Sequence, residues 1–508
     1  MLAAIGWLPP HSPIILICGI AIIFYFVSRS GSFGETLRVG FFGGLMFFLV
    51  VNRPLVSAYG WGGWSESNGM AVASGNWWLL NSLWVLISAW GALFWASVFC
   101  IYRGLLGQPI WLRVGTTIFA WFVIAEWLRA FSHWNFEWGF LGIALAEVDA
   151  LRQWASVFGV SFLSLILLVP SLLLVEFVLG DNRRKKILLS IIGVTIGLFL
   201  WFFGAALRMD ALEGLPVYRV AAFQYAPPVP RAGVTALGVS PDWFSAISTL
   251  AKKKYRLLVL PESISSHAVS FDGDRAESLG PKRQVLKGAW EAEFAYLLSE
   301  APQTYVVVGT EGVEEKKVYN STSVWNADGL LGWQHKVRLV PFAEYLPFGW
   351  GFLGSRALTY YRAGQDSLPI KAGPFMIGSF ICQEIQHGAI SRDLVMNGAN
   401  ILVTGGNDGV FSDSRVAQIH HSFARIRATE TRRYLVRAMK TGVSSIVSPN
   451  GDVIGQSPGR EATLIGAKVS LMNDQSMWVR FGHIPLIMLM LTGAVLAFFI
   501  VIFGKHRF

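Results

Sequence analysis

Residues 374–384 read PFMIGSFICQE, an apolar run that ends on a cysteine followed by two polar residues. A short apolar run of this kind predicts a buried β-strand over 374–381. In layered α/β domains, functional groups gather at the sheet edge where the strands end. Cys382 is therefore predicted to lie at such an edge, where its thiolate would attack a carbonyl carbon.

Two more residues with reactive side chains stand in comparable settings. Glu262 follows the apolar segment 257–261 (LLVLP), and Lys336 opens the segment 336–341 (KVRLVP). A buried carboxylate is a suitable base for the thiol proton, and an ammonium stabilises a developing oxyanion. Each residue taken alone is more often structural or surface-exposed. Together, Glu262, Lys336 and Cys382 predict acyl-transfer chemistry.

The composition places much of the chain in a lipid bilayer. Of the 508 residues, 53% are hydrophobic and only 15% are charged, against about 25% charged in a soluble domain. Apolar stretches that match about 30 Å of hydrocarbon cover residues 13–29, 38–52, 77–101, 111–131, 154–179, 187–207 and 484–503. The stretch 38–52 is short unless residues 54–59 extend it, and residues 1–10 fit the end of a shortened first helix.

The distribution of charge predicts how these spans are oriented. The formal net charge is +10, and the basic residues flank the apolar stretches, which favours anionic lipid headgroups over nucleic acid as their partner. Lys and Arg concentrate in the first, third and fifth connections and at the C-terminus, whereas the second and fourth connections carry Glu. The positive-inside rule then places the globular region outside the cytoplasm.

Between residues 208 and 480 the pattern changes to that of a globular α/β domain. Strands are predicted at 219–224, 256–260, 305–309, 321–326, 374–381, 401–404 and 443–448, and helices at 242–254, 281–299 and 416–431. Asp328-Gly329 and Asn450-Gly451 are tight-turn signals. Strands alternating with helices predict layers of sheet and helix. The expected domains are a transmembrane domain (1–210), an extracytoplasmic catalytic domain (217–475) and a last transmembrane helix with a cytoplasmic tail (480–508).

Several segments, in this order, resemble one family. LPES at 260–263, HKVRLVPFAEYLPFG at 335–349, ICQE at 381–384 and GNDGVF at 406–411 are similar to the nitrilase (carbon–nitrogen hydrolase) superfamily with its Glu-Lys-Cys triad. Within it, the resemblance is to the membrane-embedded apolipoprotein N-acyltransferase family. AEWLR at 125–129 resembles that family's membrane half, and ARIRATE at 424–430, after His420, resembles its late helix. The resemblance implies a multi-span α-helical membrane domain joined to an α/β nitrilase-like αββα sandwich.

The resemblance also implies a role for each matching residue. Glu262 falls on the general base, Lys336 on the oxyanion-stabilising lysine and Cys382 on the nucleophile. Three further positions fall on residues that support the site: Glu344 in the lysine loop, Glu384 two residues after the nucleophile, and Asn407 in a loop near the cysteine.

The implied reaction is the last step of lipoprotein maturation. A fatty acyl chain passes from a membrane phospholipid, through a cysteine thioester, to the α-amino group of the N-terminal diacylglyceryl-cysteine of an apolipoprotein. The implied location is the bacterial inner membrane, with the catalytic domain on the periplasmic side. No cofactor, metal or nucleic acid is expected to take part, and a monomer is expected.

Two alternatives stay open from the residues. Water could replace the amine acceptor, which would make the chain a membrane-tethered nitrilase-type amidase that hydrolyses an amide or ester. A transporter or receptor whose outer domain only binds a ligand would not need Cys382. Gln383 stands where the family commonly has tyrosine, a departure that bears on the acyl-chain or acceptor preference.

Overall fold

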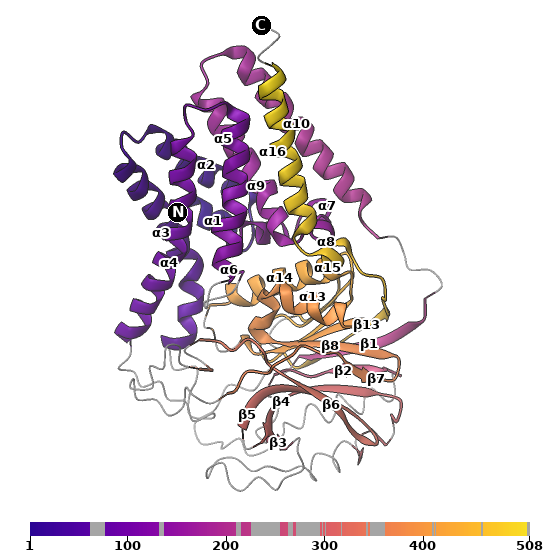
Figure 1. The fold of residues 1–508 in the computed structure, drawn as a ribbon. Helices are drawn as coiled ribbons and strands as arrows, with labels where there is room; N and C mark the ends of the chain where they lie inside the picture. The colour runs from indigo at the N-terminus through magenta and orange to yellow at the C-terminus, as the bar shows by residue number, and fades with distance from the viewer. Residues whose placement is uncertain are drawn as a thin grey trace. The chain divides into compact units, whose positions relative to one another are not determined.

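The computed structural model describes residues 1–60, 77–131, 137–209, 215–224, 254–262, 268–270, 295–296, 298–299, 301–315, 317–341, 344–345, 361–408, 411, 413–458 and 461–504. These residues form two compact units (Figure 1). The first contains the described residues up to Arg208 and those from Ser476 onward. The second contains those from Met209 to Gln475.

The first unit is helical. Its longer helices are α2 (Pro13–Arg29), α3 (Phe33–Gly60), α4 (Trp77–Gly104), α5 (Ile110–Ala120), the π-helix η1 (Trp121–Leu128), α9 (Val160–Leu179), α10 (Arg183–Ala206) and α16 (Ile484–Gly504). Its shorter elements are α1 (Leu2–Trp7), α6 (Arg129–Phe131), η2 (Leu141–Leu145), α7 (Asp149–Arg152), α8 (Ala155–Phe158) and α15 (Met477–Phe481).

Within the described residues, five helical segments are long and apolar enough to cross a membrane: Phe33–Leu55, Asn81–Gly104, Ile110–Leu128, Val160–Leu179 and Arg183–Ala206. Pro13–Arg29 and the described part of α16 are shorter apolar helices. The predicted apolar stretches are thus helical. The short stretch 38–52 gains its length because α3 continues through Pro54, as membrane helices tolerate.

Two polar side chains in this unit bond to neighbouring helices. The Asn52 side chain of α3 donates to Ser88 of α4 across 3.2 Å, and the Trp84 indole donates to the Leu49 carbonyl across 3.0 Å. Such bonds join helices where lipid offers no polar partner. In contrast, α10 exposes most of its apolar side chains, as expected of a helix that faces lipid.

The described strands of the second unit form two sheets. One has the order β13-β1-β2-β4-β5-β6, with β3 paired to β4, and the other has the order β12-β11-β10-β9-β8-β7. The strands of the first sheet are β1 (Val217–Gln224), β2 (Leu257–Val259), β3 (Ala268–Ser270), β4 (Tyr305–Glu314), β5 (Lys317–Asn326), β6 (Gly329–His335) and β13 (Thr463–Ser470). Those of the second are β7 (Ile370–Ala372), β8 (Phe375–Ile381), β9 (Ile401–Gly406), β10 (Leu435–Met439), β11 (Ser445–Val447) and β12 (Val453–Gln456).

The centre of each sheet is parallel, and this decides where the site forms. Strands β1, β2 and β4 run parallel in one sheet, and β8, β9 and β10 do so in the other. The carboxyl ends of parallel strands meet at one edge of a sheet. The segments that follow β2 and β8, which carry Glu262 and Cys382, therefore start from such edges.

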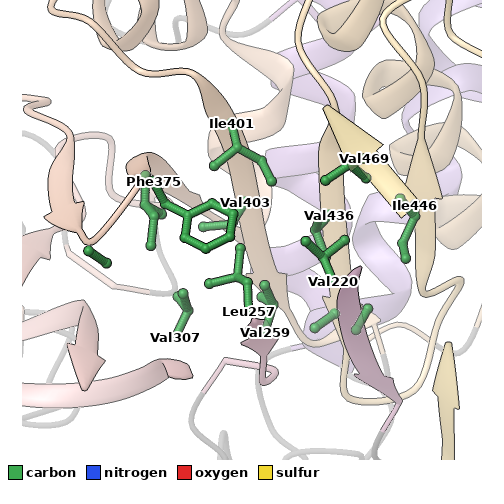
Figure 2. Packing of buried hydrophobic residues seen from close by; sticks show 14 of the residues in the cluster. Val220, Leu257, Val259, Val307, Phe375, Ile401, Val403, Val436, Ile446 and Val469 are labelled. Carbon is green, nitrogen blue, oxygen red and sulfur yellow. The ribbon is translucent and has the colours of Figure 1, made fainter. Parts of the chain in front are cut away.

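The two sheets pack face to face through an apolar core. Val220, Leu257 and Val307 of the first sheet share one buried cluster with Ile401 and Val436 of the second (Figure 2). These strands are rich in β-branched residues, which fit a pleated and buried surface.

Helices cover the outer face of the second sheet. Helix α13 (Gly388–Met396) lies against β8, and α14 (Arg415–Thr431) lies against β10 and β11 (Figure 1). On the outer face of the first sheet, Phe223, Leu258 and Trp325 are buried together with Leu298. The predicted fold class, a membrane helical part with an α/β sandwich, is confirmed. All but the last residue of the helix predicted at 242–254, and most of that at 281–299, lie outside the described residues.

Candidate active site

Glu262 is fixed at the end of β2 by close backbone packing. The Cα of Glu262 packs against Gly309 of β4. A Cβ at position 309 would come within 2.5 Å of the Glu262 Cα. A Cβ at Gly405 of β9 would come within 3.0 Å of the Glu262 nitrogen. Only glycine fits at Gly309 without a shift of the backbone. The two sheets therefore clamp Glu262 between them.

The carboxyl group of Glu262 is buried and shares a donor with Glu344. The Asn320 side chain, from β5, donates to Glu262 Oε1 across 2.7 Å and to Glu344 Oε1 across 3.1 Å. Burial raises the pKa of Glu262, and the charge of Glu344 adds to this, whereas Lys336, Asn320 and the thiol of Cys382 lower it. The result is a carboxyl group whose pKa lies above its usual value, as a general base at neutral pH requires.

Lys336 is the first residue after β6 and is held by Glu344. Its ammonium donates to Glu344 Oε1 across 2.8 Å, and its side chain is 1% exposed. Glu344 Oε2 accepts the Val340 N–H across 2.7 Å, which closes the loop over the lysine. Burial lowers the pKa of Lys336, but Glu344 and Glu262 outweigh this and raise it above its usual value. The amine therefore stays charged.

Cys382 ends β8 in a strained conformation. Its φ is +52°, which a residue with a side chain rarely adopts outside functional sites. It opens the 3-10 turn η5 (Cys382–Gln386) and is partly exposed. Its Cα lies beside Gly406, the last residue of β9, where a Cβ would come within 3.3 Å of it.

Glu384 connects the cysteine turn to the lysine loop. Its Oε2 accepts the Ile381 N–H across 2.8 Å, and its Oε1 accepts the N–H groups of Val337 and Arg338 across 2.7 and 2.9 Å. Burial raises its pKa to about 7, although Lys336 and the three backbone donors oppose this. Glu384 therefore fixes the position of Lys336 relative to Cys382.

The thiol of Cys382 lies against the predicted base. Hydrogen bonding with the thiol is one of the causes that lower the pKa of Glu262, and the backbone N–H of Asn407 lowers the pKa of the thiol in the same way. Burial and then the charge of Glu262 raise the pKa of Cys382, while Lys336 and the Asn407 N–H lower it. The resting thiol is therefore protonated and needs the adjacent carboxylate to remove its proton.

A buried polar network lies behind Asn407. Asp408 accepts from His420 of α14 across 2.8 Å and from Arg437 of β10 across 2.9 Å. Burial raises the pKa of Asp408, but His420 and Arg437 outweigh it and hold the pKa below its usual value. The Gln386 side chain lies 2.9 Å from the other nitrogen of His420. The network anchors the Asn407 loop and the end of η5 to one helix.

The structure thus brings together every residue predicted for the site: Glu262, Lys336, Cys382, Glu344, Glu384 and Asn407. The two outermost of them, Glu262 and Asn407, are 145 positions apart in the sequence. The sequence did not indicate Asn320, which is an ordinary polar residue within a strand. Its position opposite Glu311 in the β4–β5 register could be found only from the strand pairing.

Both parts of the chain match known protein families. Residues 219–476, about half of the chain, match the carbon–nitrogen hydrolase family. The chain belongs to the carbon–nitrogen hydrolase family. Residues 1–173 of this carbon–nitrogen hydrolase match the apolipoprotein N-acyltransferase N-terminal domain.

Individual relatives match this chain over most of their length. The apolipoprotein N-acyltransferase of Haemophilus ducreyi is 26% identical over 384 residues, which cover 71% of each chain. That of Nitrosomonas europaea is 25% identical over 447 residues, covering 82% of this chain and 81% of the relative. A carbon–nitrogen hydrolase of Helicobacter pylori superposes with a TM-score of 0.37 at 16% identity, covering 50% of this chain and 89% of that one. The expected family is confirmed.

Proposed function

We propose that this carbon–nitrogen hydrolase is a membrane-embedded acyltransferase. It transfers a fatty acyl chain from a phospholipid, through a thioester on Cys382, to the α-amino group of the N-terminal diacylglyceryl-cysteine of an apolipoprotein. The observation that carries the proposal is the contact of the Cys382 thiol with Glu262 beside the buried ammonium of Lys336. The matched N-terminal domain and the names of the relatives support the acceptor.

In the first half-reaction the enzyme acquires the acyl group. Glu262 takes the Cys382 proton, and the thiolate attacks the ester carbonyl of the phospholipid. Lys336, with a backbone N–H, stabilises the negative charge on the carbonyl oxygen. The ester C–O bond then breaks, Glu262 returns the proton to the leaving alkoxide, and a lysophospholipid departs.

In the second half-reaction the acceptor amine attacks the thioester. Glu262 takes a proton from the attacking nitrogen, the C–S bond breaks, and the Cys382 thiolate leaves with an amide as product. The thiolate regains a proton, so atoms and charges balance over the cycle without a change of oxidation state. The residues required are one nucleophile, one base and one fixed cation.

The membrane helices give this chemistry its location. Each methylene group of an acyl chain costs about 0.8 kcal/mol to withdraw from the bilayer, so both substrates stay in the membrane and the site must be presented to them. We propose that residues 1–210 and 480–508 form the membrane part. Residues 217–475 form a catalytic domain on the periplasmic side of the inner membrane, in accord with the charge of the connections. The chain is proposed to act as a monomer.

The test is product analysis with both substrates present. Purified full-length protein in phospholipid micelles is incubated with a synthetic diacylated lipopeptide, and the products are identified by mass spectrometry. The proposal predicts a triacylated lipopeptide with an N-terminal amide and an equal amount of lysophospholipid. C382A should give no product, whereas C100A, which removes a thiol from helix α4, should retain activity.

Other products would overturn the proposal. Release of free fatty acid at the same rate with and without lipopeptide would instead identify an amidase-type hydrolase. Full transfer by C382A would exclude the thioester mechanism.

A further inference from the structure

A second lysine stands at the same end of the sandwich. Lys440 directly follows β10, is partly buried, and donates its backbone N–H to the Gly406 carbonyl across 2.8 Å. Neither the triad pattern nor the segments that resemble the family include it. Its position is set by the strand before it.

The alternation along β10 determines where Lys440 lies. Val436 and Ala438 belong to the core between the sheets, whereas Arg437 turns to the opposite side and binds Asp408. Successive side chains of a strand alternate between its two faces. Lys440 therefore continues the row of Val436 and Ala438 and stands on the inter-sheet side.

Glu262 occupies the neighbouring position across the two sheets. Ala438 pairs with Gly405 of β9, and Gly405 packs against the backbone of Glu262. The register thus places Lys440 two residues beyond the partner of Gly405, at the end of the sandwich where Glu262 lies. The charges interact accordingly: burial lowers the pKa of Lys440, and the carboxylate of Glu262 opposes this shift.

The charges of the other groups around Glu262 determine how the ammonium of Lys440 would affect its ionisation. Lys336 is bonded to Glu344, whose negative charge disfavours ionisation of Glu262. Asn320 donates to both carboxylates, and the Cys382 thiol also lowers the pKa of Glu262. Much of the positive charge of Lys336 is therefore balanced by Glu344. The ammonium of Lys440, at this end of the sandwich, offsets the remaining negative charge, which is that of Glu262.

We propose that Lys440 is a positioning residue for Glu262, whose ammonium keeps the base ionised in the resting enzyme and ready to accept the thiol proton. This inference rests on the proposed role of Glu262 as the base. Once Glu262 holds the proton, the nearby ammonium favours its release to the departing alkoxide. Lys440 would therefore assist proton transfer in both directions without touching the acyl group.

The test measures, without any lipid, how the ionisation of Glu262 activates Cys382. Full-length protein with Cys18 and Cys100 replaced by serine is alkylated with iodoacetamide between pH 5 and 9, and the rate at Cys382 is followed by intact mass. Replacing Lys440 by methionine or glutamine should move the midpoint of the rate profile up by about one pH unit. Lys440→Arg should keep the wild-type midpoint. Lys371→Met, which removes an exposed charge from β7, serves as the control and should also keep it.

Two comparisons separate the proposed effect from a general structural one. A purely structural role would lower the alkylation rate equally at every pH and leave the midpoint in place, which would overturn the inference. In an E262Q background, which lacks the base, Lys440→Met should leave the pH–rate profile unchanged, because the effect passes through Glu262. A shift of equal size in that background would also overturn it.

The readout is independent of acyl transfer. If the midpoint moves but phospholipid never acylates Cys382, the proposed function fails and the coupling between Lys440 and Glu262 stands. If acylation occurs and the midpoint does not move, the assignment of Lys440 alone fails.

Discussion

Replacing Asn320 by alanine should change the pH dependence of the first half-reaction. Asn320 donates to Glu262 across 2.7 Å and to Glu344 across 3.1 Å, so it favours the ionised form of both carboxyl groups. A hydrogen bond to a charged group contributes about 1.5–3 kcal/mol. Since one pKa unit corresponds to about 1.4 kcal/mol, the pKa of Glu262 should rise by about one to two units in N320A.

The sign of the effect follows from the role of the base. Glu262 must be ionised to take the thiol proton, so a higher pKa removes active enzyme at low pH and leaves it intact at high pH. Below the midpoint, N320A should form the thioester about ten- to a hundredfold more slowly than the wild type. Above the new midpoint the rates should converge.

The assay is single-turnover acylation of Cys382 by phospholipid, followed by intact mass from pH 5 to 9. Asn326→Ala serves as a matched control, because Asn326 ends the same strand and bonds only locally, to Asp328. A loss in N320A that is the same at every pH, or a profile identical to that of Asn326→Ala, would refute the reasoning.

Three further perturbations test other parts of the account. Gly309→Ala should slow thioester formation about a hundredfold, because its Cβ would press on the backbone of the base; Gly197→Ala, which meets no neighbour, should not. Asp408→Asn should lower the free energy of unfolding by about 3 kcal/mol. The pKa of Asp408 in the folded protein lies below its unfolded value of about 3.9. The difference in free energy of unfolding between the wild type and the variant should therefore be present above about pH 3.9 and fade as the pH falls through the folded pKa. Denaturant titrations at several pH values measure this difference. In a cysteine-free background, Asp328→Cys should react with an impermeant maleimide in intact spheroplasts and Asp181→Cys only after permeabilisation; the reverse pattern would contradict the proposed orientation.

The sequence predicted the strands that carry the site because they are continuous apolar runs. β2 and β8 lie in the parallel centres of their sheets and are buried on both faces, so their residues 257–260 and 375–381 lack the polar alternation of exposed strands. Glu262 and Cys382 were then recognisable as the first polar groups after each run.

Other elements could not be predicted because their partners are distant in the sequence. β10 contains Arg437, whose charge interrupts the apolar pattern. Its ion-pair partner Asp408 comes next to it only when the chain folds. β13 pairs with β1, more than 200 positions away, and residues 463–470 show no clear alternation. Asn320 and Lys440 read as surface polar residues, because only the sheet register brings them to Glu262.

The account depends most directly on whether Cys382 carries the acyl group between the two substrates. Protein incubated with phospholipid alone, without acceptor, should gain the mass of one fatty acyl chain, and peptide mapping should place it on Cys382. Addition of a diacylated lipopeptide should remove that mass and deliver it to the peptide amine. An unmodified Cys382 under conditions where the triacylated product still accumulates would contradict the account.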